Sequence, residues 1–186
     1  MSAWEDLKKM ALECRRCELA KGRTNVVFGE GDPRAEVLFV GEGPGRDEDL
    51  TGRPFVGAAG KLLTKLLEEI VVLRRSDVYI ANIVKCRPPD NRDPKPEEIE
   101  ACREYLLAQI AQIRPKMICT LGRHSLHTLV DPNISISREH GKPRNWNGLT
   151  VLPMYHPAAA LYKRQLLELL EGDFRKLKEL KDRGYK

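Results

Sequence analysis

The chain has 186 residues, of which 41% are hydrophobic and 32% are charged, and these proportions are typical of a soluble globular protein with a substantial core. Its start, MSAWEDLKKM, has no apolar segment of the signal-peptide kind, and no apolar run is long enough to cross a bilayer, so we expect a cytoplasmic protein without a membrane anchor. The formal net charge of +5 suits a polyanionic partner, but charge alone does not identify one.

The first half of the chain predicts a helix, a strand and a second helix. Ser2 and Glu5 form a capping box for a helix that ends near Cys14. Residues 36–41 (EVLFVG) form an apolar run closed by glycine, which is typical of a buried strand, and a loop rich in Gly and Pro follows over 42–60. Leucines at helical spacing over 62–70 predict the next helix.

The second half repeats this alternation. Residues 78–84 (VYIANIV) predict a second strand, and the prolines of 86–96 exclude regular structure until a helix resumes with an apolar stripe over 99–113. Further strands are predicted at 117–121 (MICTL) and 149–155 (LTVLPMY), and a last helix over 164–183. No repeat or persuasive linker divides the chain, so we expect a single domain over residues 1–186.

Strands that alternate with helices predict an α/β fold, with a parallel sheet covered by helices on both faces. In such sheets ligands bind beyond the carboxyl ends of the strands. Polar or glycine-rich stretches fall at these predicted ends. They are Gly41 to Gly45 with Asp47 to Asp49, Asn82, Gly122 to Ser125, and His156 with Pro157.

The cysteines indicate a metal centre. Cys14 and Cys17 are separated by two residues, and Cys86 and Cys102 form a wider pair. Paired cysteines seldom persist as disulfides in a reducing cytosol, so we interpret these residues as metal ligands. Their spacing does not by itself distinguish zinc from an iron–sulfur cluster. The fifth cysteine, Cys119, lies in a predicted strand and is interpreted as a buried thiol.

Three motifs make the chain recognisable: GEGPGRDEDLTGRPFVGAAGKLL at 41–63, ANIVKCRPPDNRDP at 81–94 and YHPAAAL at 155–161. Together they resemble family 4 uracil-DNA glycosylases, the iron–sulfur members of the uracil-DNA glycosylase superfamily. The resemblance covers nearly the whole chain. It implies a three-layer α/β/α sandwich around a four-stranded parallel sheet, and an enzyme that hydrolyses the N-glycosidic bond of uracil in DNA during base excision repair.

The resemblance also assigns roles in the pocket. A uracil turned out of the DNA stack needs an aromatic platform, which Phe55 supplies, and a polar group that reads its edge. Asn82 offers a donor for uracil O4 and an acceptor for N3–H, whereas cytosine presents the opposite pattern. His156 is the predicted donor to uracil O2, where negative charge develops, and the glycine-rich backbone around Gly41 and Gly43 is predicted to contact the base.

The chain departs from the best-known branch of the superfamily, which has an aspartate at the position of Gly43 and a tyrosine at that of Gly45. The attacking water and the exclusion of thymine therefore need another explanation. Glu42 is our candidate for holding the water, with Asp47, Glu48 and Asp49 as substitutes. The alternative is that Glu42 only braces the loop.

The resemblance implies a [4Fe-4S] cluster on Cys14, Cys17, Cys86 and Cys102, with a structural role. It also implies that the segment after His156 enters the minor groove, and basic residues nearby are predicted to contact phosphates. The predicted DNA-binding residues are Arg87, Arg92, Pro157, Ala158, Lys163 and Arg164.

The expected partner is uracil-containing DNA, single- or double-stranded, bound by a monomer, with a sliding clamp as a candidate partner. Two other functions stay open. One is a non-catalytic iron–sulfur or zinc module that binds DNA or senses damage. The other is a glycosylase with a broader range of bases, because the tyrosine that would exclude a methyl group is absent.

Overall fold

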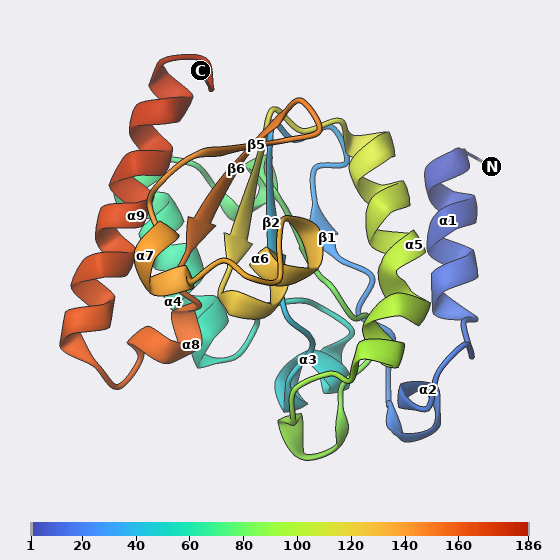
Figure 1. Cartoon of the computed structure of the whole chain (residues 1–186). Coiled ribbons are helices and arrows are strands. Elements are labelled where there is room, and N and C mark those ends of the chain that lie inside the picture. Colours follow the sequence, from blue (N-terminus) through green and yellow to red (C-terminus); the bar gives the residue numbers. More distant parts are fainter. Residues whose placement is uncertain (1, 186) are drawn as a thin grey trace.

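The computed structural model describes residues 2–185, which form a twisted sheet with helices packed on both faces (Figure 1). The strands are β1 (Glu30–Gly31), β2 (Val37–Gly41), β3 (Tyr79–Asn82), β4 (Met117–Leu121), β5 (Arg144–Trp146) and β6 (Leu149–Met154). The α-helices are α1 (Ala3–Leu12), α2 (Leu19–Gly22), α3 (Arg46–Thr51), α4 (Ala58–Leu66), α5 (Pro96–Ile113), α6 (Arg123–Leu129), α7 (Ile136–Glu139), α8 (Pro157–Ala160) and α9 (Arg164–Asp182). Other helical turns are η1 (Leu67–Val71), η2 (Arg75–Asp77) and η3 (Pro89–Asn91).

The sheet has the strand order β1-β3-β2-β4-β6-β5. Its four inner strands are parallel, which confirms the predicted α/β fold around a four-stranded parallel sheet. The structure adds β1 and β5, two antiparallel edge strands of 2 and 3 residues. These strands are too short to show the two-residue periodicity by which a strand is recognised in a sequence.

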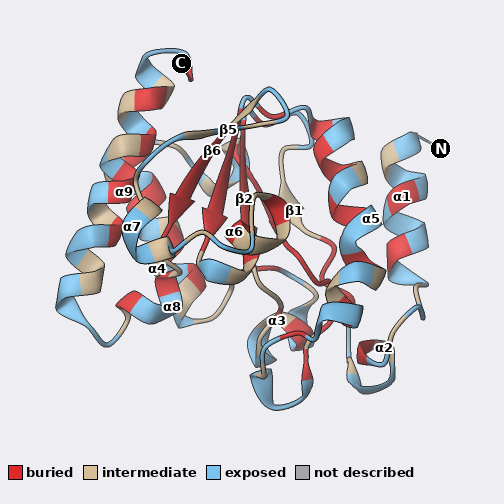
Figure 2. Ribbon diagram, viewed as in Figure 1, coloured by how far each residue is buried: buried red, intermediate tan, exposed pale blue. Residues whose placement is uncertain are grey.

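Helices cover both faces of the sheet because the central strands are apolar on both sides (Figure 2). On one face, α4, η1 and α9 pack side chains such as Leu63, Leu67 and Phe174 onto Phe39. On the other face, α5 and α6 contribute Leu106, Ile110 and Leu129. Within residues 2–185, the helices lack any apolar stretch of the length that a bilayer crossing requires.

The N-terminal helix α1 packs against the outside of α5, away from the sheet (Figure 1). Its predicted capping box is present, because the Ser2 hydroxyl accepts from the Glu5 N–H at 3.3 Å and the Glu5 carboxylate accepts from the Ser2 N–H at 2.8 Å. A third apolar cluster lies beneath α1 and includes Leu7, Cys86 and Cys102. The first helix is therefore fastened to the part of the chain that carries the wider cysteine pair.

The register of β2 and β3 determines where the candidate site forms. Gly41 and Asn82 are directly paired at the carboxyl ends of these strands. The pairing continues past them, because the N–H of Ile83 donates to Gly41 O at 3.0 Å and that of Val84 donates to Glu42 O at 3.1 Å. The start of the 42–60 loop is therefore held beside Asn82. The structure also places a short helix, α3, in that predicted loop.

Candidate active site

A cavity of about 420 Å³ opens at the carboxyl ends of the parallel strands. It is lined by predicted site residues from four separate segments: Glu42 and Gly43 after β2, Phe55 before α4, Asn82 at the end of β3, and His156 after β6. Arg92 and Ala158 lie at its wall. The fold therefore brings the candidate catalytic and base-contacting side chains to one place, as the motifs predict.

Asn82 is the most deeply buried polar group of the cavity, with 2% of its surface exposed. Its Oδ1 atom has no hydrogen-bond partner among residues 2–185, although buried side-chain oxygens are normally paired. Gly41 explains how the amide fits. A Cβ atom on Gly41 would lie 2.5 Å from Asn82 Oδ1 and 2.6 Å from the Phe55 ring, so a larger residue would displace both. Gly41 thus acts behind the cavity wall.

Phe55 has a positive φ of 49°, an uncommon backbone conformation for a bulky residue. Arg75 stabilises it from the side away from the cavity: its Nη1 donates to Phe55 O at 2.9 Å, and its other N–H groups donate to Pro54 O and to Glu30 Oε2. The Phe55 ring stacks near His156, with 5.6 Å between ring centroids. The aromatic platform is therefore held through its backbone.

His156 caps the start of α8, and its Nδ1 accepts a hydrogen bond from the Ala158 N–H at 3.0 Å. Because a backbone N–H can only donate, Nδ1 carries no proton, and the neutral ring carries its proton on Nε2. Burial lowers the pKa of His156 to about 4, against a smaller opposing effect of Glu48. The imidazole is therefore a neutral Nε2–H donor at neutral pH.

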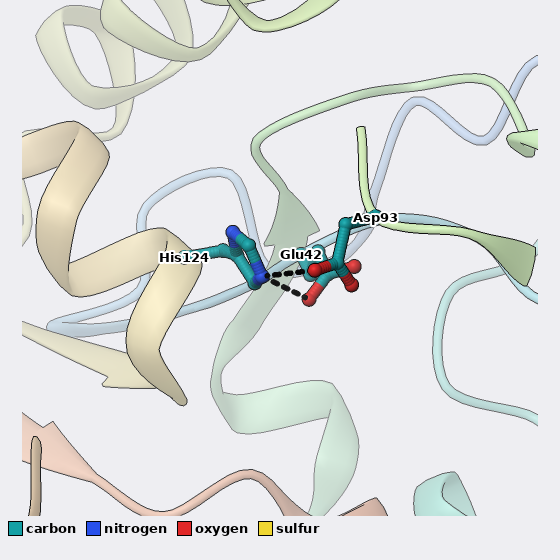
Figure 3. A group of neighbouring side chains, drawn as sticks. All are labelled: Glu42, Asp93 and His124. Carbon is teal, nitrogen blue, oxygen red and sulfur yellow. Dashed lines mark ion pairs between the residues drawn. The ribbon is translucent and has the colours of Figure 1, made fainter. Parts of the chain in front are cut away.

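Glu42, which lines the cavity, belongs to a group of three neighbouring side chains with Asp93 and His124 (Figure 3). His124 Nε2 lies 3.6 Å from Glu42 Oε2 and 3.1 Å from Asp93 Oδ2. Burial raises the pKa of the Glu42 carboxyl above its ordinary value, the charge of His124 lowers it, and Asp93 raises it again. A carboxyl with a raised pKa beside an imidazole is suited to accepting and releasing a proton.

Two of the acidic residues that follow Glu42, Glu48 and Asp49, have structural roles, whereas Asp47 is exposed and does not line the cavity. Glu48 accepts hydrogen bonds from the N–H groups of Gly45, Val56 and Gly57 at 3.0–3.2 Å, and so ties the two ends of the cavity loop together. Asp49 is buried and accepts from the N–H groups of Thr24 and Asn25. Their oxygens are already engaged, which leaves Glu42 as the better candidate for holding a water.

The glycines that replace an aspartate and a tyrosine are explained by their surroundings. A Cβ atom on Gly43 would lie 2.7 Å from Val84 Cγ2, and one on Gly45 would lie 2.9 Å from Glu48 Oε2. A side chain at either position would have to displace these neighbours. The loop is therefore built around glycine, and Glu48 stands in the space beside Gly45.

The predicted metal ligands Cys14, Cys17, Cys86 and Cys102 line one hollow between α1, α2, α5 and the segment after β3. Arg23 Nη1 lies 3.4 Å from Cys86 Sγ, and the Lys85 N–H donates to Cys102 Sγ at 3.3 Å. Burial raises the pKa of Cys102 to about 11, so a bound metal ion would have to replace the thiol proton. Four sulfur donors beside the Arg23 guanidinium and the Lys85 backbone N–H fit an anionic metal–thiolate centre.

Lys85 connects this hollow to the cavity. Its side chain is buried, and its Nζ donates to Asn82 O at 2.9 Å and to Gln109 Oε1 at 2.6 Å. Burial lowers the pKa of Lys85 to about 8, and the neighbouring Cys102 and Cys86 oppose that effect. One residue thus contacts both a predicted ligand and the strand end that carries Asn82.

The predicted DNA-binding residues are arranged differently from one another. Arg92 forms two hydrogen bonds, of 2.9 and 2.7 Å, with the buried Glu98 carboxylate. Within residues 2–185 the Arg87 side chain hydrogen-bonds to the exposed Asn91, and Lys163 and Arg164 are exposed at the start of α9. Ala158 is exposed at the cavity rim, whereas Pro157 is buried. Arg87 is therefore free to meet a phosphate, while Arg92 already supports the loop.

Comparison with known proteins identifies the family. The uracil DNA glycosylase superfamily matches residues 28–179. The chain is 51% identical to a type-4 uracil-DNA glycosylase of Sulfurisphaera tokodaii, over 97% of this chain and 86% of the relative. Identity is also 51% to the type-4 enzyme of Archaeoglobus fulgidus (97% and 94% covered) and 48% to that of Thermotoga maritima (94% and 92%). The chain belongs to the type-4 uracil-DNA glycosylases.

Within this type-4 chain, several residues around the site were not singled out from the sequence. Asp93 lies in the predicted proline-rich loop. His124 lies in the polar stretch from Gly122 to Ser125, to which the sequence motifs assign no role. Arg75 acts on the backbone of Phe55, a contact that leaves no pattern in the sequence. Of these residues, His124 is the one that the sequence could most readily have indicated, because it follows a predicted strand end.

Proposed function

We propose that this chain removes uracil from DNA by hydrolysing its N-glycosidic bond, leaving an abasic site for base excision repair. The observation that carries the proposal is the buried, unpaired Oδ1 of Asn82 in a cavity that also contains Phe55 and His156. An unpaired buried acceptor is unfavourable unless a ligand supplies a donor, and the N3–H of uracil is such a donor. Cytosine has no hydrogen at N3 and leaves the acceptor unpaired.

His156 supports departure of the base. As the C1′–N1 bond breaks, its electron pair stays on uracil and negative charge gathers on O2. The neutral ring can donate its Nε2–H to this oxygen. The low pKa of His156 keeps the ring in this form throughout the neutral range. Protonation of Nδ1 would in addition remove the acceptor that the Ala158 N–H uses.

Glu42 supports attack by water on the sugar. The water oxygen forms a bond to C1′, and one of its protons passes to the Glu42 carboxylate. The carboxylate lies at the cavity wall and is 28% exposed, so it can meet a water without being fully solvated. This hydrolytic route requires no covalent bond between the enzyme and DNA.

A [4Fe-4S] cluster on Cys14, Cys17, Cys86 and Cys102 is part of the proposal. Among the described residues, no three of these four sulfur atoms all lie within 4.8 Å of one another. A single tetrahedral zinc would hold its sulfur atoms about 4 Å apart. The cluster would fasten α1 and α2 to the segment after Asn82 and stabilise the fold there.

The proposed partner is DNA that contains uracil. The net charge of +5, the half-buried Arg87 and the exposed Lys163 and Arg164 favour contacts with phosphates. A monomeric state and binding to a sliding clamp stay predictions from the sequence.

The proposal is tested by measuring base release under single-turnover conditions from oligonucleotides that contain uracil, cytosine, thymine or hypoxanthine. We expect uracil release by the wild type, a gain of cytosine release in Asn82→Asp, and a loss of about 10²-fold in His156→Ala. Asn145→Asp, an exposed change in β5, is the matched control and should behave as the wild type.

Three outcomes bear on the alternatives. An iron-loaded protein that binds uracil-containing DNA without releasing the base would be a non-catalytic module, and the proposal would be wrong. Release of thymine or hypoxanthine at rates like that of uracil would show a broader base range. Release of uracil by Glu42→Gln at the wild-type rate would limit Glu42 to bracing the loop.

A further inference from the structure

The candidate water-holding residue, Glu42, is one of three ionisable side chains that the fold brings together. Glu42 follows β2, Asp93 lies between η3 and α5, and His124 is in the first turn of α6 (Figure 3). The His124 ring lies against both carboxylates, at 3.1 Å from Asp93 and 3.6 Å from Glu42. None of these residues is near another in the sequence, so the arrangement depends on the packed sheet.

The three side chains differ in their access to water. The side chains of Glu42 and His124 are 28% and 23% exposed, whereas that of Asp93 is 64% exposed. The contact between Glu42 and His124 is therefore better shielded than the one between His124 and Asp93, and the charge of His124 should affect Glu42 more strongly.

A metal ion is not the best occupant of this group. Arg123, the residue before His124, places its guanidinium 3.7 Å from Asp93 Oδ2. A cation that used Asp93 as a ligand would therefore meet a positive charge already at the same carboxylate. The group is better suited to controlling the charge of Glu42.

We propose that His124 and Asp93 are positioning residues for Glu42, with His124 holding Glu42 as a carboxylate that can receive a proton from the attacking water, and Asp93 holding and partly neutralising His124. This inference rests on the proposed role of Glu42 in hydrolysis. The charged groups that face Glu42 are His124 and Arg123 from α6 and Asp93 from the loop before α5. The two cations favour the carboxylate and Asp93 opposes it.

The proposal predicts that His124→Gln and Asp93→Asn move the pH midpoint of uracil excision in opposite directions. Only the ionised carboxylate can accept the proton, so the rate of excision should rise with pH through the pKa of Glu42. His124→Gln removes a positive charge but keeps an N–H donor, so the midpoint of the rise should move to higher pH. Asp93→Asn removes a negative charge in the same volume, so the midpoint should move to lower pH.

The experiment is a pH profile of single-turnover uracil excision from a single-stranded oligonucleotide, with enzyme in saturating excess so that DNA affinity does not limit the rate. We expect the midpoint to rise by about one pH unit in His124→Gln and to fall by about half a pH unit in Asp93→Asn. His127→Gln is the matched control, because His127 lies in the same helix but bonds to Ile134 O at 2.7 Å and should leave the midpoint unchanged.

Opposite shifts support the proposal. Unchanged midpoints, shifts in the same direction, or a wild-type rate that does not rise with pH would overturn it. Should His124→Gln be unfolded, Arg123→Gln removes the second cation and must move the midpoint upward. Wild-type excision by Glu42→Gln would contradict the role of Glu42 itself, whereas slow excision by Glu42→Gln without opposite shifts would contradict only the roles of His124 and Asp93.

Discussion

The cavity has two sides that are held by different forces. The base side, formed by Gly41, Phe55 and Asn82, is buried and is fixed by backbone pairing, close packing and hydrogen bonds to carbonyl groups. The water side, formed by Glu42 at the cavity wall and by Asp93 and His124 grouped with it, is partly exposed and is held by contacts between ionisable groups. On the base side Gly41, Asn82 and Phe55 are packed too closely for an added methyl group, whereas the water side consists of three ionisable side chains beside one another.

This difference matches what each side has to recognise. Distinguishing uracil from cytosine depends on the position of one donor and one acceptor, so the base side must have a fixed shape. Holding a water that loses a proton depends on charge, so the water side must have a suitable pKa. We therefore expect small changes in side-chain volume on the base side to lower the rate of excision. Changes in charge on the water side should mainly alter the pH dependence of that rate.

The largest effect is expected from Gly41→Ala, which tests whether shape controls the base side. The added Cβ would displace the Asn82 amide and the Phe55 ring, and a misplacement of about 1 Å can lower a rate about 10²-fold. The measurement is single-turnover uracil excision. Gly172→Ala is the control, because a Cβ there meets nothing within 4 Å and should leave the rate unchanged. Wild-type excision by Gly41→Ala would mean that the base side is adaptable.

A smaller effect is expected from Lys85→Met, which removes the buried donor to Asn82 O while keeping the volume. We expect excision to fall about tenfold, because loss of one fixed hydrogen bond is worth about 1.4 kcal/mol. Visible absorbance of the iron centre, recorded on the same sample, separates a displaced Asn82 from a lost cluster. Lys8→Met, an exposed change on α1, should alter neither signal. Full activity with full absorbance in Lys85→Met would show that Asn82 needs no support from that side.

The support behind Phe55 is tested by Arg75→Ala. Two backbone carbonyl groups, of Pro54 and Phe55, lose their donors, and we expect about a fivefold decrease in excision. The neighbouring Arg74→Ala is the control, because Arg74 bonds only to Asp77 within its own turn and is exposed. Equal effects of the two changes would mean that the strained backbone of Phe55 is held by other contacts.

The smallest effect is expected outside both sides, at Arg87. We expect Arg87→Ala to weaken binding to DNA a few-fold and to reduce the slope of log affinity against log salt by about one, with little change in the rate of the bound complex. Arg92→Ala should in addition lower the melting temperature, because it removes the charged partner of the buried Glu98 carboxylate. Affinity that stays constant across a salt series in Arg87→Ala would exclude a phosphate contact there.

The strand ends and the base side could be predicted from the sequence because both leave local patterns. Apolar runs over 36–41, 78–84 and 149–155 located the edge of the sheet, although β3 ends at Asn82, two residues before the predicted end, and the motifs around Phe55 and His156 supplied the residue types. The structure brings these residues to one cavity.

The water side could be predicted only in part. Glu42 is adjacent to a strand end, but Asp93 follows a run of prolines, and its approach to His124 depends on how α5 and α6 pack on the same face of the sheet. The edge strands were missed because they are very short, and the contacts of Arg75 and Lys85 with backbone carbonyl groups have no sequence signature. Contacts that depend on tertiary packing were thus the ones left unpredicted.

The pairing of Gly41 with Asn82 means that the register of two strands determines how the Asn82 side chain is oriented. Successive residues of a strand point to opposite faces, so sliding β3 by one position would place Ile83 or Ala81 opposite Gly41 and turn the carboxamide away. Neither neighbour can pair with a pyrimidine edge. If Asn82 reads the base as proposed, the alignment of these two buried strands also determines which base this protein removes.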